Sequence, residues 1–536
     1  MAEPAKKQSF LHGAALLAIA TAVVKLIGAF YKIPLKMIIG DQGYGYFVTA
    51  YDVYSVLLLI STAGLPVAMS RMISHASALG NQDQVRKVYR TARMIFLALG
   101  LVSSTFMILG SKWLANEVLM QPNAAYAIAC LGPCALFMGI ISTFRGFFQG
   151  HGNMAPTSAS QVLEAFVKLL VGLGLAFLLT VRYHSVPLAA AGAILGVTSG
   201  CLVSAIFLYT KFRPAYRQLP ASCGQADSFS ATAKGLLAIA VPITIGSAGL
   251  QLLTVIEQKL YMGQLLHTLG LSQDTADTMK GIYSMTMTIY NMPCAFIVPI
   301  SISVIPAITS ALTLKNHTAV RETEESAARV AGLISLPCSV GLCLLARPIM
   351  ALLGGYSGEK LDLATRLMTL LGLCVFLYAI IQYTNALLQS HGFAHLPVIN
   401  MLLAGITKLI VVYILVGNPN IGILGAPMGS VLSYTAIATL NLLSIRRVVE
   451  QKPALLSNLL RPVLPAALMG VVVWFCRFLL ERLLGTDGSR VLLCGMPIAI
   501  GACVYVVGIS LFKTLKREDC LLLPKGEKLA KLLKLR

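Results

Sequence analysis

The chain is dominated by apolar runs long enough to cross a lipid bilayer. A membrane-spanning helix needs about 20 mostly apolar residues, and the runs between charged or turn-rich breaks predict about 14 such helices. The runs lack the apolar–polar alternation of membrane β-strands, so the sequence predicts an all-α, polytopic membrane protein. The predicted spans are 12–38, 45–68, 92–111, 124–147, 161–181, 187–210, 233–258, 281–311, 328–352, 363–388, 396–416, 421–445, 463–484 and 491–512.

The composition points the same way, because 57% of the residues are hydrophobic and only 12% are charged. That charged share is about half of the ~25% of a typical soluble protein. It excludes a disordered chain, a coiled coil, a disulfide scaffold and an ordinary soluble enzyme. Lys6 and Lys7 precede the first run as in a signal peptide, but no small-residue cleavage site follows. We therefore expect a retained first helix.

The charges are unequal, with 42 Lys and Arg against 21 Asp and Glu, a net charge of +21. Cationic residues favour cytoplasmic loops. If the N-terminus is inside, 27 of the cations fall in inner segments and 8 in outer segments. This split predicts that both termini are cytoplasmic and that the number of spans is even.

An internal repeat relates the two halves of the chain. Residues 149–169 match residues 389–409 at an offset of 240, including a Gln-x-His-Gly turn and an intramembrane lysine. Repeats of six spans each enter the membrane in the same orientation, as in transporters with parallel repeats. The predicted segments are an N-tail 1–11, an N-lobe 12–210 (spans 1–6), a cytoplasmic linker 211–232, a C-lobe 233–445 (spans 7–12), a loop with an extra span pair 446–512, and a basic cytoplasmic C-tail 513–536.

When cations near the ends of spans are counted with the flanking segments, seven remain inside the predicted spans, where each charge costs at least ~2.5 kcal/mol on insertion scales. Lys25, Lys32 and Lys36 fall on one stripe of the first helix at spacings of 7 and 4. We expect Lys25 and Lys32 to face a water-filled cavity, whereas Lys36 lies near the outer end and has the alternative of extending to the interface. All three are candidate substrate-binding residues.

Two further lysines occupy equivalent places in the repeat. Lys168 follows Glu164 by one helical turn, so a self-neutralised Glu–Lys pair is the alternative to a role in the cavity. Its counterpart Lys408 has Ala404 in the equivalent place, so we expect Lys408 to line the cavity or to find a partner elsewhere. A cationic interior predicts an anionic substrate, for which lysine is suited as a point charge.

Three intramembrane acids are candidates for coupling or charge balance: Asp52, Glu164 and Glu257. Asp52 either counters the lysine stripe or binds a coupling cation. The tyrosines around it are expected at the membrane interface; they are Tyr44, Tyr46, Tyr51 and Tyr54. Candidate conformational residues are Gly28 and Pro34, which favour a kink in the first helix, and Arg145 before the Gln-x-His-Gly turn.

Catalysis finds no support in the sequence. The 12 cysteines show no CxxC or Cys/His spacing of a metal site, and they are expected to be small packing residues. There is no GxxxxGK[ST] loop for ATP and no Ser/His/Asp constellation. We expect a protein that is not an enzyme and has no catalytic residues, no metal, no cofactor and no nucleic-acid partner.

The last residues, 528–536, form a short cationic amphipathic stretch. It is expected to lie on the anionic inner leaflet of the membrane. The alternative is a binding segment for a partner protein, such as an envelope-biosynthesis enzyme.

The chain resembles the multidrug/oligosaccharidyl-lipid/polysaccharide exporter superfamily over about 10–512. Within it, the chain looks like the polysaccharide-transporter branch that holds the lipid II flippases and the sporulation proteins of the stage V B type. The resemblance rests on Lys25-Leu-Ile-Gly-Ala-Phe-Tyr-Lys-Ile-Pro34, Gly40-Asp-Gln-Gly-Tyr-Gly-Tyr46, Gly64-Leu-Pro66 with the basic loop from Arg71, and Arg145-Gly-Phe-Phe-Gln-Gly-His-Gly152.

The resemblance implies two six-helix lobes, a central cavity and alternating access. It implies that basic residues of the first span hold a pyrophosphate, where this chain has Lys25 and Lys32 in place of the branch's arginines. It also implies that spans 13 and 14 help to form a groove for a lipid tail. The expected location is the bacterial cytoplasmic membrane.

The resulting hypothesis is a flippase for a lipid-linked, undecaprenyl pyrophosphate-type precursor of peptidoglycan or polysaccharide. Two alternatives stay open. A cation-coupled multidrug antiporter of the same superfamily would want acids in its cavity. A non-transport membrane scaffold for envelope biosynthesis would act through the basic loops and tail. The sequence leaves open the sugar, the coupling ion, the oligomeric state, and whether the role is in vegetative wall, capsule or spore cortex.

Overall fold

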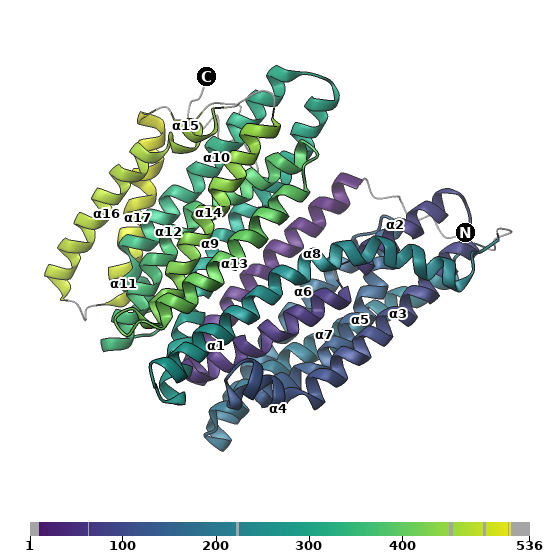
Figure 1. The fold of residues 1–536 in the computed structure, drawn as a ribbon, viewed down its shortest axis with the longest axis horizontal. Helices are drawn as coiled ribbons and strands as arrows, with labels where there is room; N and C mark the ends of the chain where they lie inside the picture. The colour runs from purple at the N-terminus through teal and green to yellow at the C-terminus, as the bar shows by residue number, and fades with distance from the viewer. Residues whose placement is uncertain are drawn as a thin grey trace. The chain divides into compact units, whose positions relative to one another are not determined.

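The computed structural model describes residues 10–62, 64–220, 225–449, 454–485, 489–512 and 514–515, and every regular element in these ranges is a helix (Figure 1). The predicted all-α membrane fold is thereby confirmed. The contacts divide the chain into two compact units. The first is Met1–Leu266 with Leu271–Gly281, and the second is His267–Gly270 with Ile282–Arg536. The N-tail 1–9 and the basic stretch 528–536 lie outside the described residues.

The first unit contains eight α-helices and the start of a ninth, with three short 3-10 or π turns between them. Its helices are α1 (Phe10–Thr62), α2 (Leu65–Ala78), α3 (Gln82–Leu109), α4 (Ser111–Trp113), α5 (Ala125–Gly150), α6 (Ala155–Tyr183), α7 (Val186–Arg217), α8 (Phe229–Gly263) and the first turns of α9 (Gln273–Thr313). The short turns are η1 (Leu114–Val118), η2 (Pro122–Ala124) and η3 (Gln264–Thr268).

The predicted first two spans join in α1, which bends at a single glycine. Gly40 has φ 71° and ψ −175°, a conformation that a residue with a Cβ rarely adopts. The predicted kink positions, Gly28 and Pro34, keep helical backbone instead. The chain therefore reverses at Gly40, and the proline is accommodated inside the helix.

The linker between the repeats is hydrogen-bonded to the first turns of α3. Arg86 donates from Nη2 to the carbonyl oxygens of Leu219 and Pro220 at 3.0 and 3.2 Å. Gln84 Nε2 donates to Asp227 Oδ2 at 2.7 Å. The linker leads directly into α8, which packs against α1, α2 and α3. α8 thus belongs to the first unit, although the repeat assigns it to the second lobe, and the lobe boundary stays a prediction.

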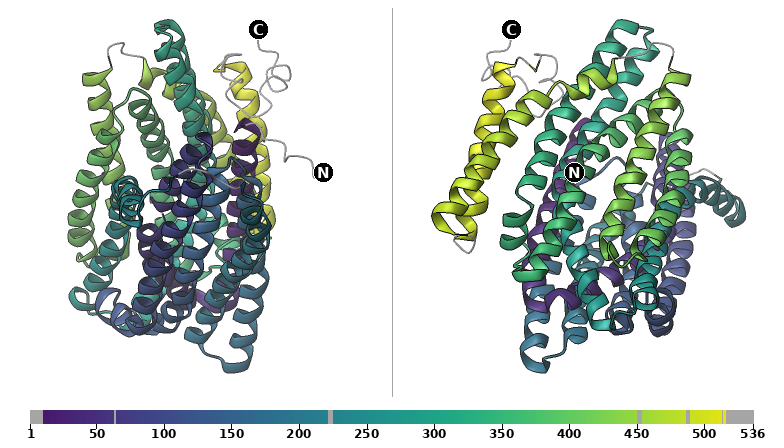
Figure 2. Two further views of the ribbon diagram at one scale, coloured as in Figure 1. Left: turned by 90° about the vertical axis from the view of Figure 1, so that its right-hand side faces the viewer. Right: turned by 60° about the vertical axis from the view of Figure 1, so that its left-hand side comes forward.

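The second unit contains the rest of α9 and eight further α-helices. They are α10 (His317–Leu344), α11 (Ala346–Leu352), α12 (Gly358–Ser390), α13 (His395–Val416), α14 (Gly425–Val448), α15 (Leu455–Leu460), α16 (Val463–Leu484) and α17 (Arg490–Leu511). The 3-10 helix η4 (Gly422–Leu424) precedes α14. The predicted extra pair of spans is the hairpin of α16 and α17, drawn in yellow in Figure 2.

Ten of the described helices are long and apolar enough to cross a membrane. They account for ten of the predicted spans, and the long helices α1, α8 and α9 cover the other four. The count of about 14 spans stays a prediction.

The repeat reappears in the backbone of the turns after α5 and α12. The amide of Gly152 donates to the carbonyl of Gln149 at 2.9 Å, and that of Gly392 to Gln389 at 3.1 Å. Both glycines have positive φ, 73° and 88°. Since glycine adopts positive φ without the strain of a Cβ, the Gln-x-His-Gly pattern ends both helices in the same way.

The pair α6 and α7 approaches closely through glycines. A Cβ on Gly196 would lie 2.2 Å from the Cα of Gly172, and one on Gly200 would lie 2.6 Å from the carbonyl oxygen of Glu164. Small residues at such crossings allow membrane helices to pack backbone against backbone. This contact sets the position of Glu164 relative to α7.

We predict that Gly196→Ala destabilises the protein by about 1–3 kcal/mol, because the added methyl group overpacks the crossing. The measurement is the thermal unfolding midpoint of the purified protein in detergent. Gly174→Ala on α6 is the control, since a Cβ there meets nothing within 4 Å. Equal midpoints for the two variants would contradict the packing described here.

Candidate functional site

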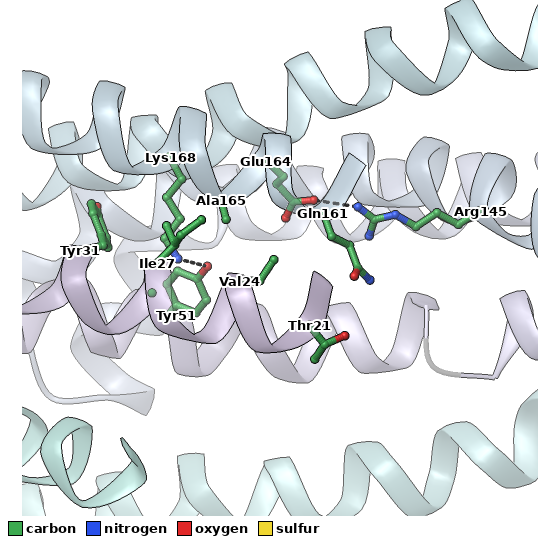
Figure 3. Close-up of a pocket in the computed structure, with 11 residues that line it drawn as sticks. Thr21, Val24, Ile27, Tyr31, Tyr51, Arg145, Gln161, Glu164, Ala165 and Lys168 are labelled. Atoms are coloured by element: carbon green, nitrogen blue, oxygen red, sulfur yellow. Dashed lines mark hydrogen bonds and ion pairs between the residues drawn. The ribbon is translucent and has the colours of Figure 1, made fainter. Parts of the chain in front are cut away.

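The first unit contains a pocket of about 270 Å³ lined by α1, α5 and α6 (Figure 3). Charged, aromatic and aliphatic side chains surround it. The lining residues are Thr21, Val24, Ile27, Gly28, Tyr31, Tyr51, Arg145, Gln161, Glu164, Ala165 and Lys168. The pocket thus gathers four of the residues singled out by the sequence: Gly28, Arg145, Glu164 and Lys168.

Lys168 is held in the pocket by two tyrosines of α1. Its Nζ donates to the hydroxyl of Tyr51 at 3.1 Å. The same atom lies 4.9 Å from the ring centre of Tyr51 and 5.2 Å from that of Tyr31. A cation over an aromatic face is stabilised by the ring quadrupole, by about 2 kcal/mol when desolvated. The rings therefore keep a lysine charge inside the membrane without neutralising it.

Glu164 pairs with Arg145 of α5 rather than with Lys168 on its own helix. Arg145 Nη2 lies 3.0 Å from Glu164 Oε2, and Arg145 Nε donates to Ser160 Oγ at 3.1 Å. The side chains are 13% and 26% exposed, so the pair borders the pocket while partly desolvated. The predicted alternative of a self-neutralised helix pair is not what forms, because Lys168 turns to Tyr51.

Two thiols form the wall behind Glu164. Cys201 Sγ of α7 lies 3.9 Å from Glu164 Oε1 and 2.9 Å from Cys134 Sγ of α5. Cys134 in turn donates to the hydroxyl of Tyr54 at 3.2 Å. Both cysteines are buried, in keeping with the expected packing role, and they also supply weak polar groups beside the carboxylate.

The lysines of α1 lie around the pocket rather than in its lining. Lys25 is exposed and sits between the lining residues Val24 and Ile27 in the chain. Lys32 is half-buried, within electrostatic reach of Lys168 and Asp52. Lys36 is buried and pairs with Asp41 at 3.1 Å, across the bend at Gly40. An acid from beyond the bend thus accompanies Lys36.

Asp52 finds its partner on α9. Its Oδ2 lies 3.7 Å from Nζ of Lys280, whose ammonium group also sits 5.4 Å from the ring centre of Tyr261. Glu257 is buried within electrostatic reach of both members of this pair. The sequence alone does not indicate Lys280 as the partner of Asp52, because 228 positions separate the two residues.

A second polar cluster involves Asp277, one turn before Lys280. Its carboxylate accepts hydrogen bonds from Tyr46 Oη at 2.8 Å, Gln121 Nε2 at 2.8 Å and Gln273 Nε2 at 3.0 Å. Burial raises the pKa of the Asp277 carboxyl from its usual value, and these hydrogen bonds counteract part of that shift. The cluster ties the first turns of α9 to α1.

The tyrosines of α1 correct one expectation. Tyr44, Tyr46 and Tyr54 are buried inside the first unit, and Tyr51 is half-buried beneath Lys168. They are not an interface belt, because each faces a polar or aromatic partner within the protein. A tyrosine in the sequence is compatible both with an anchor at the membrane interface and with a buried polar contact, so the sequence does not distinguish these two roles.

The second unit has a different arrangement at the equivalent positions. Asn441 donates to Thr384 Oγ1 at 2.9 Å and to Asn385 Oδ1 at 2.8 Å, and Asn400 donates to Asn441 Oδ1 at 2.9 Å. Lys408 is half-buried on α13, near Gly429 of α14, where an added Cβ would lie 3.7 Å from its Cγ. Among the described residues, no group of three or more His, Cys, Asp and Glu side chains has the arrangement of a metal site.

Comparison with known proteins identifies the family. The model of the family described as polysaccharide biosynthesis protein matches residues 10–312, more than half of the chain. The chain belongs to this family. A second model, MatE, matches residues 277–414.

Relatives and solved structures extend the comparison over nearly the whole length of this chain. Stage V sporulation protein B of Bacillus subtilis is 24% identical over 525 residues, 97% of this chain and 98% of the relative. Lipid II flippase MurJ of the same species is 22% identical, covering 92% and 94%. A structure of lipid II flippase MurJ in an inward closed conformation has a TM-score of 0.68 at 14% identity, covering 93% and 98%.

The protein is therefore a multi-pass membrane transporter of the multidrug/oligosaccharidyl-lipid/polysaccharide exporter superfamily, in its polysaccharide and lipid II flippase branch.

We predict that Lys280→Met destabilises this transporter by about 3 kcal/mol, because it leaves Asp52 charged and unpaired in a desolvated site. The double variant Asp52→Asn, Lys280→Met should recover part of that loss. Thermal unfolding in detergent measures both. The control is Arg347→Met, which breaks a pair with Asp362 whose side chains are 41% and 56% exposed, so it should cost no more than about 1 kcal/mol. Equal losses for Lys280→Met and the control would refute the pairing.

Proposed function

We propose that this transporter is a flippase for a lipid-linked, undecaprenyl pyrophosphate-type precursor of peptidoglycan or polysaccharide. The observation that supports it is the pair of cations in the pocket, Lys168 and Arg145. Both face a space of about 270 Å³, to which we assign the pyrophosphate group of the cargo. In this proposal the lipid tail stays in the bilayer.

The two cations contribute differently. Lys168 presents a point charge, and Arg145 presents a planar guanidinium that matches two phosphate oxygens at once. With Glu164 included, the three side chains carry a net positive charge. Lys25 and Lys32 add further positive charge beside the pocket, so an anion approaching it meets a favourable potential.

The relatives support the same substrate class. One of them is named a lipid II flippase and another a sporulation protein, and the family is described by polysaccharide biosynthesis. We extend this cargo class to the present chain, with alternating access as the transport cycle. Lys408, in the second unit, remains a candidate second contact for the headgroup. Like its relatives, the protein is proposed to transport without catalysing a reaction.

The predicted orientation, with both termini in the cytoplasm of a bacterium, gives the cycle a direction. An inside-negative potential favours outward movement of each uncompensated negative charge by ~2.3 kcal/mol per 100 mV. The basic stretch 528–536, outside the described residues, is proposed to rest on anionic lipids of the inner leaflet or to bind envelope-biosynthesis enzymes.

A second candidate is a cation-coupled multidrug antiporter, which the MatE match over residues 277–414 supports. The net positive charge of the pocket argues against a cationic drug as its cargo. Export of cationic dyes that depends on Asp52 or Glu164 would favour the antiporter. Accumulation of a lipid-linked precursor on the inner leaflet after depletion of the protein would favour the flippase.

We predict that Lys168→Gln lowers the rate of precursor translocation in proteoliposomes by about tenfold or more, because one charge-assisted contact to phosphate is lost. Arg145→Gln should lower it similarly. Lys25→Ala and Lys32→Ala test the flanking lysines in the same assay.

Arg182→Gln is the control, because Arg182 lies in the last turn of α6, outside the pocket. It removes one positive charge from the same helix as Lys168 and should leave the rate unchanged. Wild-type rates for Lys168→Gln and Arg145→Gln together would remove the pocket from the proposed function.

A further inference from the structure

We propose that binding of the anionic headgroup in this pocket is coupled to protonation of Glu164. The inference rests on the proposed function. It concerns the Glu164 carboxylate, which is paired with Arg145 in the pocket. Glu164 holds Arg145 at 3.0 Å in the absence of cargo. A phosphate group that takes Arg145 must displace that carboxylate.

Among the described side chains that face Glu164, none is a further strong cation once the headgroup is bound. Arg145 comes from α5, Lys168 from the next turn of α6, Cys201 from α7 and Tyr51 from α1. Lys168 already donates to Tyr51 and is the second cation that faces the pocket. The thiol at 3.9 Å is a weak donor. The headgroup would therefore take both positive charges on which the carboxylate depends.

The charge balance then favours a proton on Glu164. A pyrophosphate diester carries two negative charges, whereas the three charged residues that line the pocket, Lys168, Arg145 and an ionised Glu164, sum to one positive charge. A carboxylate left ionised beside phosphate oxygens experiences repulsion, which strengthens as the local dielectric falls. When Glu164 takes a proton from water, the pocket presents two positive charges to two negative ones.

The open side of the pocket gives that proton a source. Thr21 lines the pocket and is exposed, and Glu164 itself is 26% exposed. Water can thus deliver the proton directly, without a relay through other side chains. No bond other than that between the proton and the carboxylate oxygen forms in this step.

The repeat does not carry this ion pair into the second unit. The positions equivalent to Arg145 and Glu164 are Asn385 and Ala404, while the lysine is kept as Lys408. The second copy thus retains a cation and lacks both members of the pair. At these positions, only the first unit allows an anion to displace a carboxylate from an arginine.

The test is calorimetric binding of a short-chain dialkyl pyrophosphate diester, whose two acid groups stay ionised at neutral pH, to the full-length protein in lipid nanodiscs. Titrations in two buffers of different ionisation enthalpy give the number of protons taken up. We expect wild-type protein to take up as much as one proton per anion. Its Kd should then fall by up to about tenfold for each unit decrease in pH, since uptake of one proton shifts the equilibrium by that factor.

Glu164→Gln should bind the probe with no proton uptake and a Kd independent of pH. Glu481→Gln is the matched control, because Glu481 also pairs with an arginine, Arg477, at 2.7 Å, in the α16–α17 hairpin of the second unit. It should keep the pH dependence of the wild type. If Glu164→Gln fails to fold, Glu164→Ala, which copies Ala404, replaces it.

The outcomes separate this inference from the proposed function. Probe binding by the wild type without proton uptake overturns the coupling and leaves the flippase proposal standing. The same holds if Glu164→Gln retains the wild-type proton uptake. No binding by the wild type at any pH overturns both.

Discussion

The structure depends on the cost of an unpaired charge inside a membrane. The intramembrane charges of the first unit are stabilised by different contacts. Arg145 is paired with Glu164, Lys36 with Asp41 and Asp52 with Lys280. Lys168 is placed over two aromatic rings. Because a pair stabilises most when both members are held in place, these contacts also fix which helices lie together. Ion pairs and hydrogen bonds join the helices of the first unit. At these sites, apolar packing alone would not determine how far one helix is shifted along another.

The sequence predicts features that depend on neighbouring residues, and it does not predict contacts between residues far apart in the chain. Span positions, the repeat and the intramembrane lysines are local patterns, and ten of the predicted spans coincide with helices that are long and apolar enough to cross a membrane. Partners are not local. The i,i+4 rule favours a pair of Glu164 with Lys168. In the structure Glu164 pairs instead with Arg145, 19 positions away on α5, whose guanidinium also donates to Ser160. Lys280, Asp41 and the hydrogen bonds to Asp277 likewise come from segments that only the tertiary fold brings together.

The two copies of the repeat show how one framework hosts different polar chemistry. Both end α5 and α12 with the same glycine turn. The first copy has a charged group of Arg145, Glu164 and Lys168, whereas the second has amides that bond one another, centred on Asn441. A closed amide network has little capacity left for a ligand. An arginine paired with a carboxylate keeps that capacity, and for this reason we propose the first unit as the place for cargo.

The thiols behind Glu164 have a practical consequence for spectroscopy. Site-directed labelling usually starts from a variant in which every cysteine is replaced by serine. Here that replacement would put hydroxyl groups, stronger donors than thiols, where Cys201 faces the carboxylate and Cys134 faces Tyr54. A cysteine-free background would thus alter the electrostatics beside the pocket of the first unit before any label is attached. Labels would report the native pocket more faithfully on a chain that keeps this pair and loses only its more accessible thiols.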